Sequence, residues 1–314
     1  MSLAIAVKNF DPDAWVERMQ KVLPNRSVEA WETAAQSAES VRYLLAWKAP
    51  EEALNAFPNV EVIFSLGAGV DHLLGSAKLP DVPIVRIVDK NLTMRMTEWV
   101  TLQVLLHHRD QLTYSHQQAQ ANWKSHSQPA ASDIRVGILG LGELGADAAK
   151  ALAGLGFKVA GWSRSAKHVD GIDSYHGADQ LDAFLARTDI LVNLLPFTPA
   201  TEGLVDYAFL SKLAKDGKGG APVYVNAGRG GTQVEGDLVK ALKDGTLKGA
   251  SIDVFAVEPL DSQSELWALP NCIVTPHVAA ESEPDALSRY VADQIAEYEA
   301  GRPLKNVVNR SAGY

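Results

Sequence analysis

A glycine pattern near the middle of the chain constrains the fold more than any other feature. Three glycines with the spacing G-x-G-x-x-G follow the apolar run Ile134–Leu139 and precede an alanine-rich segment with helical spacing. A strand, a tight turn and a helix in this order are typical of a dinucleotide-binding domain, where the second glycine lets a pyrophosphate approach the backbone. Amides at the helix N-terminus then face the phosphates. We expect this turn to bind a dinucleotide through Gly140, Gly142, Glu143, Leu144 and Gly145.

Apolar runs alternate with helical patterns along most of the chain, which predicts βαβ units and parallel sheets. The first part has four runs: Leu3–Val7, Val41–Trp47, Val60–Leu66 and Ile84–Val88. The second part has six: Ile134–Leu139, Phe157–Trp162, Ile190–Leu195, Val223–Asn226, Ala250–Val254 and Cys272–Thr275. The sequence therefore predicts an α/β protein with two doubly wound parallel-sheet domains of the Rossmann or flavodoxin type, and an active-site cleft between them.

One long helical pattern, Thr97–Ala121, contains no Gly or Pro and connects the two predicted domains. The last helical pattern, Pro284–Ala300, and the tail after it have no further strand to join, so we expect this segment to return to the first domain. The predicted domains are a substrate domain of residues 1–97 plus 286–314 and a dinucleotide-binding domain of residues 98–285. The length of the connecting helix also favours a homodimer.

Composition excludes several classes of function. The net charge of −9 gives no basic face for nucleic acid. No run approaches the roughly 18 apolar residues of a membrane-spanning helix, so we expect no membrane contact and a cytoplasmic location. The chain has one cysteine, Cys272, which excludes a disulfide framework. The histidines of the connecting helix lack accompanying carboxylates or cysteines, and we predict no metal site.

The residues after the run Phe157–Trp162 indicate which dinucleotide is bound. An NAD-binding domain usually has an acidic residue at this position, which holds the ribose 2′-hydroxyl. Here no acid is present, and an arginine can pair with a 2′-phosphate through its planar fork. We therefore predict NADPH as the cofactor, with NADH as the alternative. The residues expected to hold the phosphate are Ser163, Arg164, Ser165 and Lys167.

Reactive side chains follow three later strands, at the edge where an open α/β sheet binds its ligands. Arg229 follows Val223–Asn226, Glu258 follows Ala250–Val254, and His277 follows Cys272–Thr275. An Arg, a Glu and a His in this arrangement predict a carboxylate clamp and a general acid oriented by a carboxylate.

These motifs together resemble the D-isomer-specific 2-hydroxyacid dehydrogenases over nearly the whole chain. The motifs are Gly-x-Gly-x-x-Gly, Asn-x-Gly-Arg-Gly, Asp-Val-Phe-x-x-Glu-Pro-Leu and Thr-Pro-His-x-Ala. Trp-Ser-Arg after the second strand of the dinucleotide domain, Asn193-Leu194-Leu195-Pro196 and the ending Ala312-Gly313-Tyr314 are most similar to the NADPH-dependent glyoxylate/hydroxypyruvate reductase A branch.

The resemblance implies a role for each motif residue. It implies that Arg229 holds the substrate carboxylate and carbonyl oxygen, that His277 protonates that oxygen, and that Glu258 pairs with His277. The cofactor-binding residues that it adds are Leu195, Pro196, Ala227 and Asp253, with Asp253 on the nicotinamide carboxamide. The substrate-binding residues that it adds in the first part of the chain are Trp47, Gly67, Ala68, Gly69 and Arg95.

The expected activity is reduction of a small 2-keto acid, glyoxylate or hydroxypyruvate, to the D-2-hydroxy acid. Two alternatives stay open. One is another D-2-hydroxyacid dehydrogenase, of the D-lactate or phosphoglycerate type. The other is a binding protein on the same fold that senses NAD(P)H without catalysis.

Overall fold

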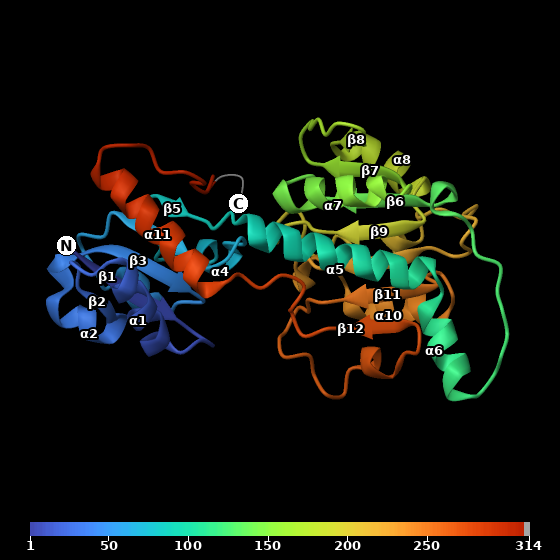
Figure 1. The fold of residues 1–314 in the computed structure, drawn as a ribbon, viewed down its shortest axis with the longest axis horizontal. Coiled ribbons are helices and arrows are strands. Elements are labelled where there is room, and N and C mark those ends of the chain that lie inside the picture. The colour runs from blue at the N-terminus through green and yellow to red at the C-terminus, as the bar shows by residue number, and fades with distance from the viewer. Residues whose placement is uncertain (311–314) are drawn as a thin grey trace. The chain divides into compact units, whose positions relative to one another are not determined.

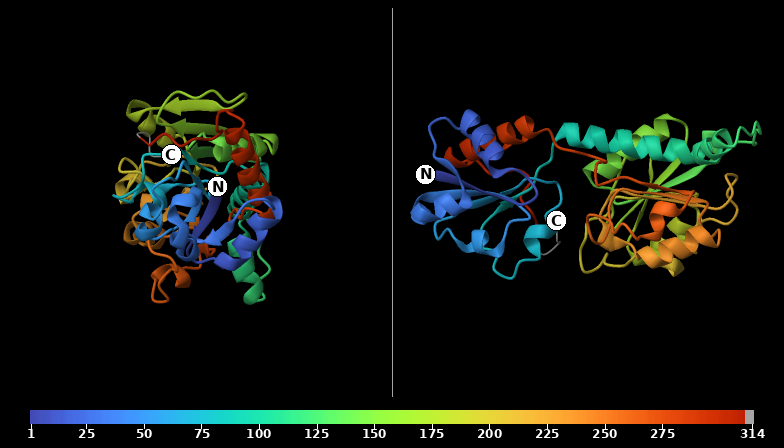
Figure 2. Two further views of the ribbon diagram at one scale, coloured as in Figure 1. Left: turned by 90° about the vertical axis from the view of Figure 1, so that its left-hand side faces the viewer. Right: turned by 90° about the horizontal axis from the view of Figure 1, so that it is seen from below.

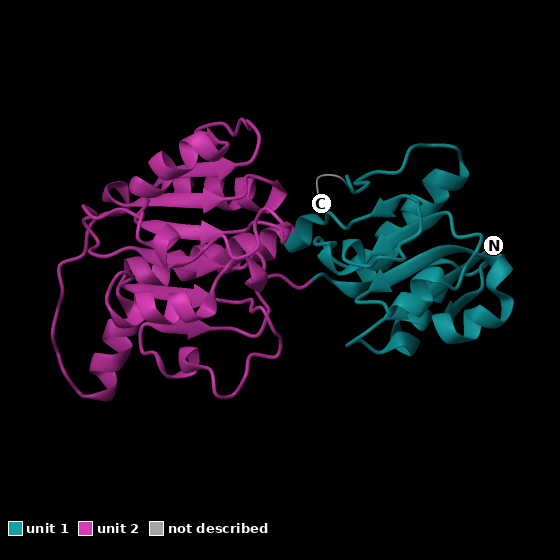
Figure 3. Cartoon of the chain, turned by 180° about the vertical axis from the view of Figure 1, so that it is seen from behind, with its two compact units in different colours: residues 1–92, 282–314 teal, residues 93–281 magenta. Residues whose placement is uncertain are grey.

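The structure is a computed structural model in which residues 1–310 are described. The ending Ala312-Gly313-Tyr314, which contributes to the sequence resemblance, lies outside the described residues. The chain divides into two compact units, drawn in different colours in Figure 3. Unit 1 consists of residues 1–92 and 282–314, and unit 2 consists of residues 93–281.

Unit 1 is built on a parallel sheet of five strands in the order β2-β1-β3-β4-β5. The strands are β1 Ser2–Val7, β2 Val28–Ala30, β3 Val41–Trp47, β4 Val62–Ser65 and β5 Ile84–Val85. The helices are α1 Pro12–Val22, α2 Trp31–Ala34, η1 Ala35–Ser40, α3 Glu51–Asn55, α4 Asp71–Leu74 and α11 Pro284–Glu299. Successive side chains of a strand point to opposite faces, so the buried strands contribute side chains to two hydrophobic cores, one on each face of the sheet.

The two faces of the unit 1 sheet are covered by different helices. One core packs Ile5 and Leu45 against Trp15 of α1 and Val291 of α11. The other core lies on the opposite face and is completed by α3 and α4. The last long helix of the chain therefore belongs to the first sheet (Figure 1).

Unit 2 is built on a parallel sheet of seven strands in the order β12-β11-β10-β9-β6-β7-β8. The strands are β6 Arg135–Leu139, β7 Lys158–Ser163, β8 Asp173–His176, β9 Ile190–Asn193, β10 Val223–Asn226, β11 Gly249–Ile252 and β12 Cys272–Val274. The helices of this part are α5 Lys90–His108, α6 Gln111–Ala119, η2 Ala131–Asp133, α7 Glu143–Gly154, η3 Ala178–Gln180, α8 Leu181–Ala186, α9 Tyr207–Leu210, η4 Gly230–Thr232, α10 Glu235–Lys243 and η5 Glu265–Ala268.

Helices cover both faces of the unit 2 sheet, as Figures 1 and 2 show. On one face Val136 and Val192 pack with Val100 of α5 and with α7. On the other face Leu191 and Tyr224 pack with α8, α9 and α10. The alternation within each strand explains the arrangement, because Leu191 and Val192 are sequence neighbours that point to opposite faces. The prediction of two parallel-sheet α/β domains is confirmed.

Two strands and one helix boundary differ from the sequence prediction. The sheets have five and seven strands rather than four and six, because β2 and β8 were missed. Both are short edge strands with mixed or polar side chains, and they lack an apolar run. The single helix predicted over Thr97–Ala121 is also wrong, since α5 ends at His108 and α6 begins at Gln111. Asp110 adopts a left-handed conformation, φ 53°, at the break.

Among residues 1–310, no helix combines the length and the apolar character needed to cross a membrane. The same part of the chain contains no group of three or more His, Cys, Asp or Glu residues able to hold a metal ion.

Candidate active site

The candidate site of unit 2 lies along one edge of the seven-stranded sheet, at the carboxyl ends of the strands. Parallel strands end at the same edge, and ligands of open α/β sheets bind there. In sheet order, the predicted residues at this edge are His277 after β12, Asp253 after β11, Arg229 after β10, Leu195 after β9, Gly140 after β6 and Ser163, the last residue of β7.

The turn between β6 and α7 has the backbone that a pyrophosphate requires. Gly140 has φ 100°, which residues with a Cβ rarely adopt. A Cβ on Gly145 would lie 1.9 Å from the carbonyl oxygen of Gly140, so only glycine allows this approach of helix and turn. Gly142 has no neighbour within 4 Å of an added Cβ, and it is the N-cap residue of α7, which has no side-chain cap. The open space and the uncapped amides fit a bound dinucleotide phosphate.

The residues predicted to hold the 2′-phosphate lie at the end of β7. Arg164, Ser165 and Lys167 are exposed, whereas Ser163 is buried. The Ser163 hydroxyl donates a hydrogen bond of 2.8 Å to the carbonyl oxygen of Ser165. Ser163 therefore shapes this turn, and the part of all four residues in phosphate binding stays a prediction.

Arg229 lies in the loop after β10, which packs closely between the loops after β9 and β11. A Cβ on Gly228 would lie 2.7 Å from the Leu195 carbonyl oxygen, and one on Gly230 would lie 1.9 Å from the Phe255 carbonyl carbon. Glycines on both sides of Arg229 thus let the β10 loop pack between the β9 and β11 loops. The Arg229 guanidinium donates to the carbonyl oxygen of Gly228 through Nη1, at 2.8 Å.

His277 and Glu258 form a direct pair. The imidazole Nδ1 lies 2.9 Å from Glu258 Oε2 and 3.0 Å from Oε1. An ionised carboxylate can only accept hydrogen bonds, so Nδ1 carries the proton and Nε2 is left for other partners. Glu258 Oε1 also accepts the backbone N–H of Phe255 at 3.2 Å, which fixes the carboxylate. The side chain of His277 is 42% exposed and that of Glu258 is 25% exposed, so the imidazole remains accessible.

Buried amide and hydroxyl side chains behind this edge form a hydrogen-bond network that the sequence analysis missed. Asn193 Nδ2 donates to Thr232 Oγ1 at 2.8 Å, and Thr232 donates to the Arg229 carbonyl oxygen. Asn226 Nδ2 donates to Gln233 Oε1 at 2.8 Å, and Gln233 Nε2 donates to the Val254 carbonyl oxygen. The network ties the β9, β10 and β11 ends together and fixes the Arg229 loop. Asn193 and Asn226 stand inside the quoted motifs, which was the available signal.

Unit 1 brings two of its predicted substrate residues together at the carboxyl ends of β3 and β4. A Cβ on Gly67 would lie 2.2 Å from Trp47, so the indole packs directly on this glycine. The Trp47 ring also lies 4.6 Å from the His72 ring, centroid to centroid. Ala68 and Gly69 continue the loop between Gly67 and α4.

Three other predicted residues take the following places. Arg95 is an exposed residue of α5. Pro196 lies three residues after the last residue of β9, and Ala227 directly follows β10. The roles assigned to them in binding stay predictions.

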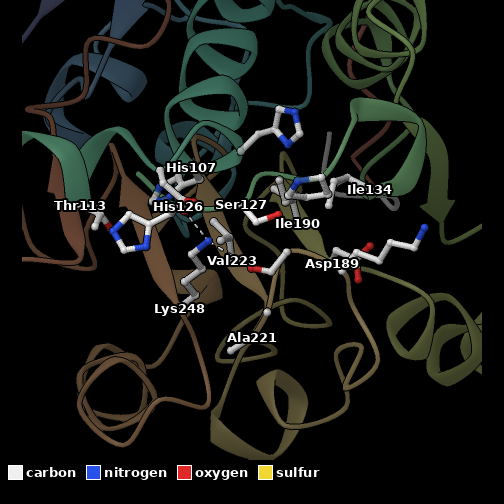
Figure 4. Close-up of a pocket in the computed structure, with 16 residues that line it drawn as sticks. His107, Thr113, His126, Ser127, Ile134, Asp189, Ile190, Ala221, Val223 and Lys248 are labelled. Carbon is white, nitrogen blue, oxygen red and sulfur yellow. Dashed lines mark hydrogen bonds and ion pairs between the residues drawn. The ribbon is translucent and has the colours of Figure 1, made fainter. Parts of the chain in front are cut away.

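A cavity of about 410 Å³ lies at the opposite, amino-terminal edge of the unit 2 sheet (Figure 4). It is lined by residues next to the beginnings of β6, β9 and β10, among them Ile134, Ile190 and Val223, and by His107 and Lys248. None of the lining residues belongs to the predicted site.

Comparisons with known proteins agree with this geometry. Residues 101–279 match the family model described as D-isomer specific 2-hydroxyacid dehydrogenase, NAD binding domain. The chain is 37% identical to glyoxylate/hydroxypyruvate reductase A of Enterobacter sp. (strain 638), over 97% of each chain.

Two crystal structures have nearly the same fold. One is an NADPH-dependent glyoxylate/hydroxypyruvate reductase from Sinorhizobium meliloti in complex with NADP and sulfate, with TM-score 0.94 and 46% identity over 100% of both chains. The other is a probable 2-hydroxyacid dehydrogenase from Rhizobium etli CFN 42 in complex with NADP, HEPES and L(+)-tartaric acid. Its TM-score is 0.95, with 45% identity over 100% of this chain and 99% of that one. The resemblance seen in the sequence is confirmed, and the chain belongs to the D-isomer specific 2-hydroxyacid dehydrogenase family.

Proposed function

We propose that this protein reduces small 2-keto acids, glyoxylate and hydroxypyruvate, to D-2-hydroxy acids with NADPH. The observation that carries the proposal is the pairing of His277 Nδ1 with Glu258 at 2.9 Å on the sheet edge that also carries the glycine turn. The two relatives crystallised with NADP support the choice of cofactor.

The residues that would hold the cofactor are those of the β6–α7 turn and of the β7 end. Amides of the first turn of α7 would bind the pyrophosphate, and Arg164 would pair with the 2′-phosphate. Asp253, Ala227, Leu195 and Pro196 would line the remaining part of the site. When bound, the cofactor supplies a hydride.

The chain's own residues would bind and protonate the keto acid. Arg229 presents a planar guanidinium, which matches a carboxylate in two parallel hydrogen bonds. Glu258 orients the imidazole through Nδ1, so His277 would donate a proton from Nε2 to the keto oxygen. In unit 1, Gly67, Ala68 and Gly69 would offer backbone amides to the substrate carboxylate. We assign Trp47 of unit 1 and Arg95, which belongs to unit 2, to substrate binding as well.

The test is the oxidation of NADPH and of NADH with a panel of glyoxylate, hydroxypyruvate, pyruvate, 3-phosphohydroxypyruvate and phenylpyruvate. The proposal expects the first two substrates to have the highest kcat/KM, with NADPH preferred. A preference for pyruvate would instead indicate a D-lactate dehydrogenase type, and a preference for 3-phosphohydroxypyruvate would indicate a phosphoglycerate dehydrogenase type. If the protein binds the cofactor but turns over none of these substrates, the alternative of a non-catalytic protein that senses NAD(P)H is favoured.

We also propose a homodimer. Leu102 of α5 is half exposed, and Trp123, which follows α6, is fully exposed. Large apolar side chains on a surface favour burial against a partner. Light scattering during gel filtration checks this, and the mass of one chain would contradict it.

A reductase that consumes NADPH acts where this cofactor is regenerated, so the proposal includes a cytoplasmic location.

A further inference from the structure

The backbone of His277 adopts a conformation that needs support. Its φ is 57°, in the left-handed region that residues with a Cβ rarely occupy. Its N–H donates to the Asp253 carbonyl oxygen at 2.8 Å and to the Thr275 carbonyl oxygen at 3.1 Å. The direction of the imidazole therefore depends on the contacts that keep this loop on the end of β11.

The Asp253 carboxylate binds the loop on both sides of His277. Its Oδ1 accepts the hydroxyl of Thr275 at 2.5 Å and the N–H of Val278 at 2.9 Å. Its Oδ2 accepts the N–H of Ala279 at 2.9 Å. Asp253 is only 1% exposed, so these donors compensate a carboxylate that has almost no contact with water.

We infer that Thr275 and Asp253 act as a positioning pair that sets the backbone, and through it the imidazole direction, of His277. Glu258 acts on the ring itself, whereas Asp253 and Thr275 act on the chain that carries the ring. Hydrogen bonds to an ionised group are the stronger ones. The Thr275 hydroxyl is the only side-chain donor that the described residues 1–310 show to this carboxylate.

The inference rests on the proposed function and adds two positioning residues to it. A misplacement of about 1 Å of a reacting group can cost on the order of 100-fold in rate. A slightly turned imidazole would still allow the substrate carboxylate to bind at Arg229. Loss of the Thr275 hydroxyl should therefore lower kcat much more than it changes KM or the Kd of NADPH.

The experiment compares Thr275→Val with Thr275→Ser, which keeps the hydroxyl. Thr188→Val is the matched control, because Thr188 is fully buried near the opposite edge of the same sheet and donates its hydroxyl to the Phe184 carbonyl oxygen at 2.7 Å. We measure kcat and KM for glyoxylate, the Kd of NADPH by fluorescence, and the midpoint of thermal unfolding. Thr275→Val should lose about tenfold or more in kcat with KM and Kd within threefold, and Thr275→Ser should restore most of it.

The outcomes separate the two claims. The proposed function is refuted if the wild-type protein fails to oxidise NADPH with any of the keto acids tested. An active wild type in which Thr275→Val loses no more kcat than Thr188→Val refutes the positioning pair, as does equal loss in Thr275→Val and Thr275→Ser. If Thr275→Val does not fold, Thr275→Ala removes the same hydroxyl without a branched side chain and is judged by the same criteria.

Discussion

The two edges of the seven-stranded sheet use polar side chains in different ways. At the carboxyl edge, Asn193, Asn226 and Asp253 bind the backbone of loops, and the groups that these loops carry stay accessible. His277, for example, is 42% exposed. Here the hydrogen bonds hold the loops that carry the predicted reactive side chains.

At the amino edge, charged side chains form ion pairs with one another. Asp189, which precedes β9, accepts from Arg135 Nε at 3.0 Å and from Arg135 Nη2 at 2.7 Å. These bonds and a further one to Asp216 raise the pKa of the Arg135 guanidinium. Lys248 pairs with Asp110 at 2.5 Å beside the cavity of Figure 4. We therefore expect the carboxyl edge to serve chemistry and the amino edge to serve stability, and substitutions at the two edges should separate these properties.

The largest expected effect is on activity at the carboxyl edge. His277→Gln removes the proton donor, and general acid catalysis contributes about 10²–10⁴-fold. We expect kcat for glyoxylate to fall by that factor while the midpoint of thermal unfolding moves little. Activity within threefold of the wild type would remove His277 from the chemistry.

The amino edge should show the reverse behaviour. Arg135→Met leaves the buried Asp189 carboxylate without its bidentate partner, which costs on the order of 3–5 kcal/mol of unfolding free energy. Urea denaturation measures this loss, and kcat of the folded protein should stay near the wild-type value. Lys212→Met is the control, since it removes an ion pair with Asp182 in which both side chains are about half exposed or more. Equal losses in the two variants would contradict the distinction.

His107 makes stability at the amino edge depend on pH. Burial lowers the pKa of His107 to about 4. An unfolded chain with an ordinary histidine binds a proton as pH falls below about 6.5, whereas the folded protein does not until about pH 4. The unfolding free energy should therefore drop by about 2 kcal/mol between pH 7 and pH 5 through this group. His107→Gln should have a smaller drop in urea denaturation at the two pH values, and an unchanged drop would contradict the assignment.

The smallest expected effect concerns the cofactor. Arg164→Asp should lower the ratio of kcat/KM with NADPH to that with NADH by about tenfold or more, because a charge-assisted pair with the 2′-phosphate is replaced by repulsion. Lys158→Asp makes the same change of charge at the beginning of β7, and Lys158 is also exposed. Its ratio should stay close to the wild-type value. Equal shifts in both variants would mean that net charge, and not Arg164, selects the cofactor.

The sequence correctly predicted those strands and turns that depend on a local residue pattern. The run Val223–Asn226 is β10 without any change of boundary, and the glycine turn follows β6 as predicted. In contrast, β8 has the sequence Asp-Ser-Tyr-His and becomes a strand only because it pairs with β7. The break at Asp110 has no glycine or proline signal and coincides with the ion pair to Lys248.

The candidate site follows the same rule. Motif spacing predicted Arg229, Glu258 and His277 as reactive residues after strand ends, and the structure places Glu258 in contact with His277. It could not reveal that Thr275 donates to Asp253, because this contact joins residues 22 positions apart and depends on neighbouring strands β11 and β12. Nor could it indicate that the Trp47 indole packs on Gly67.

The most direct test of the central claim is a double-mutant cycle on kcat for glyoxylate reduction with Glu258→Ala and His277→Gln. If Glu258 acts by orienting the imidazole through its contact with Nδ1, it has nothing to orient once the ring is gone. The double variant should then have the same kcat as His277→Gln alone. Losses that multiply in the double variant would contradict the account.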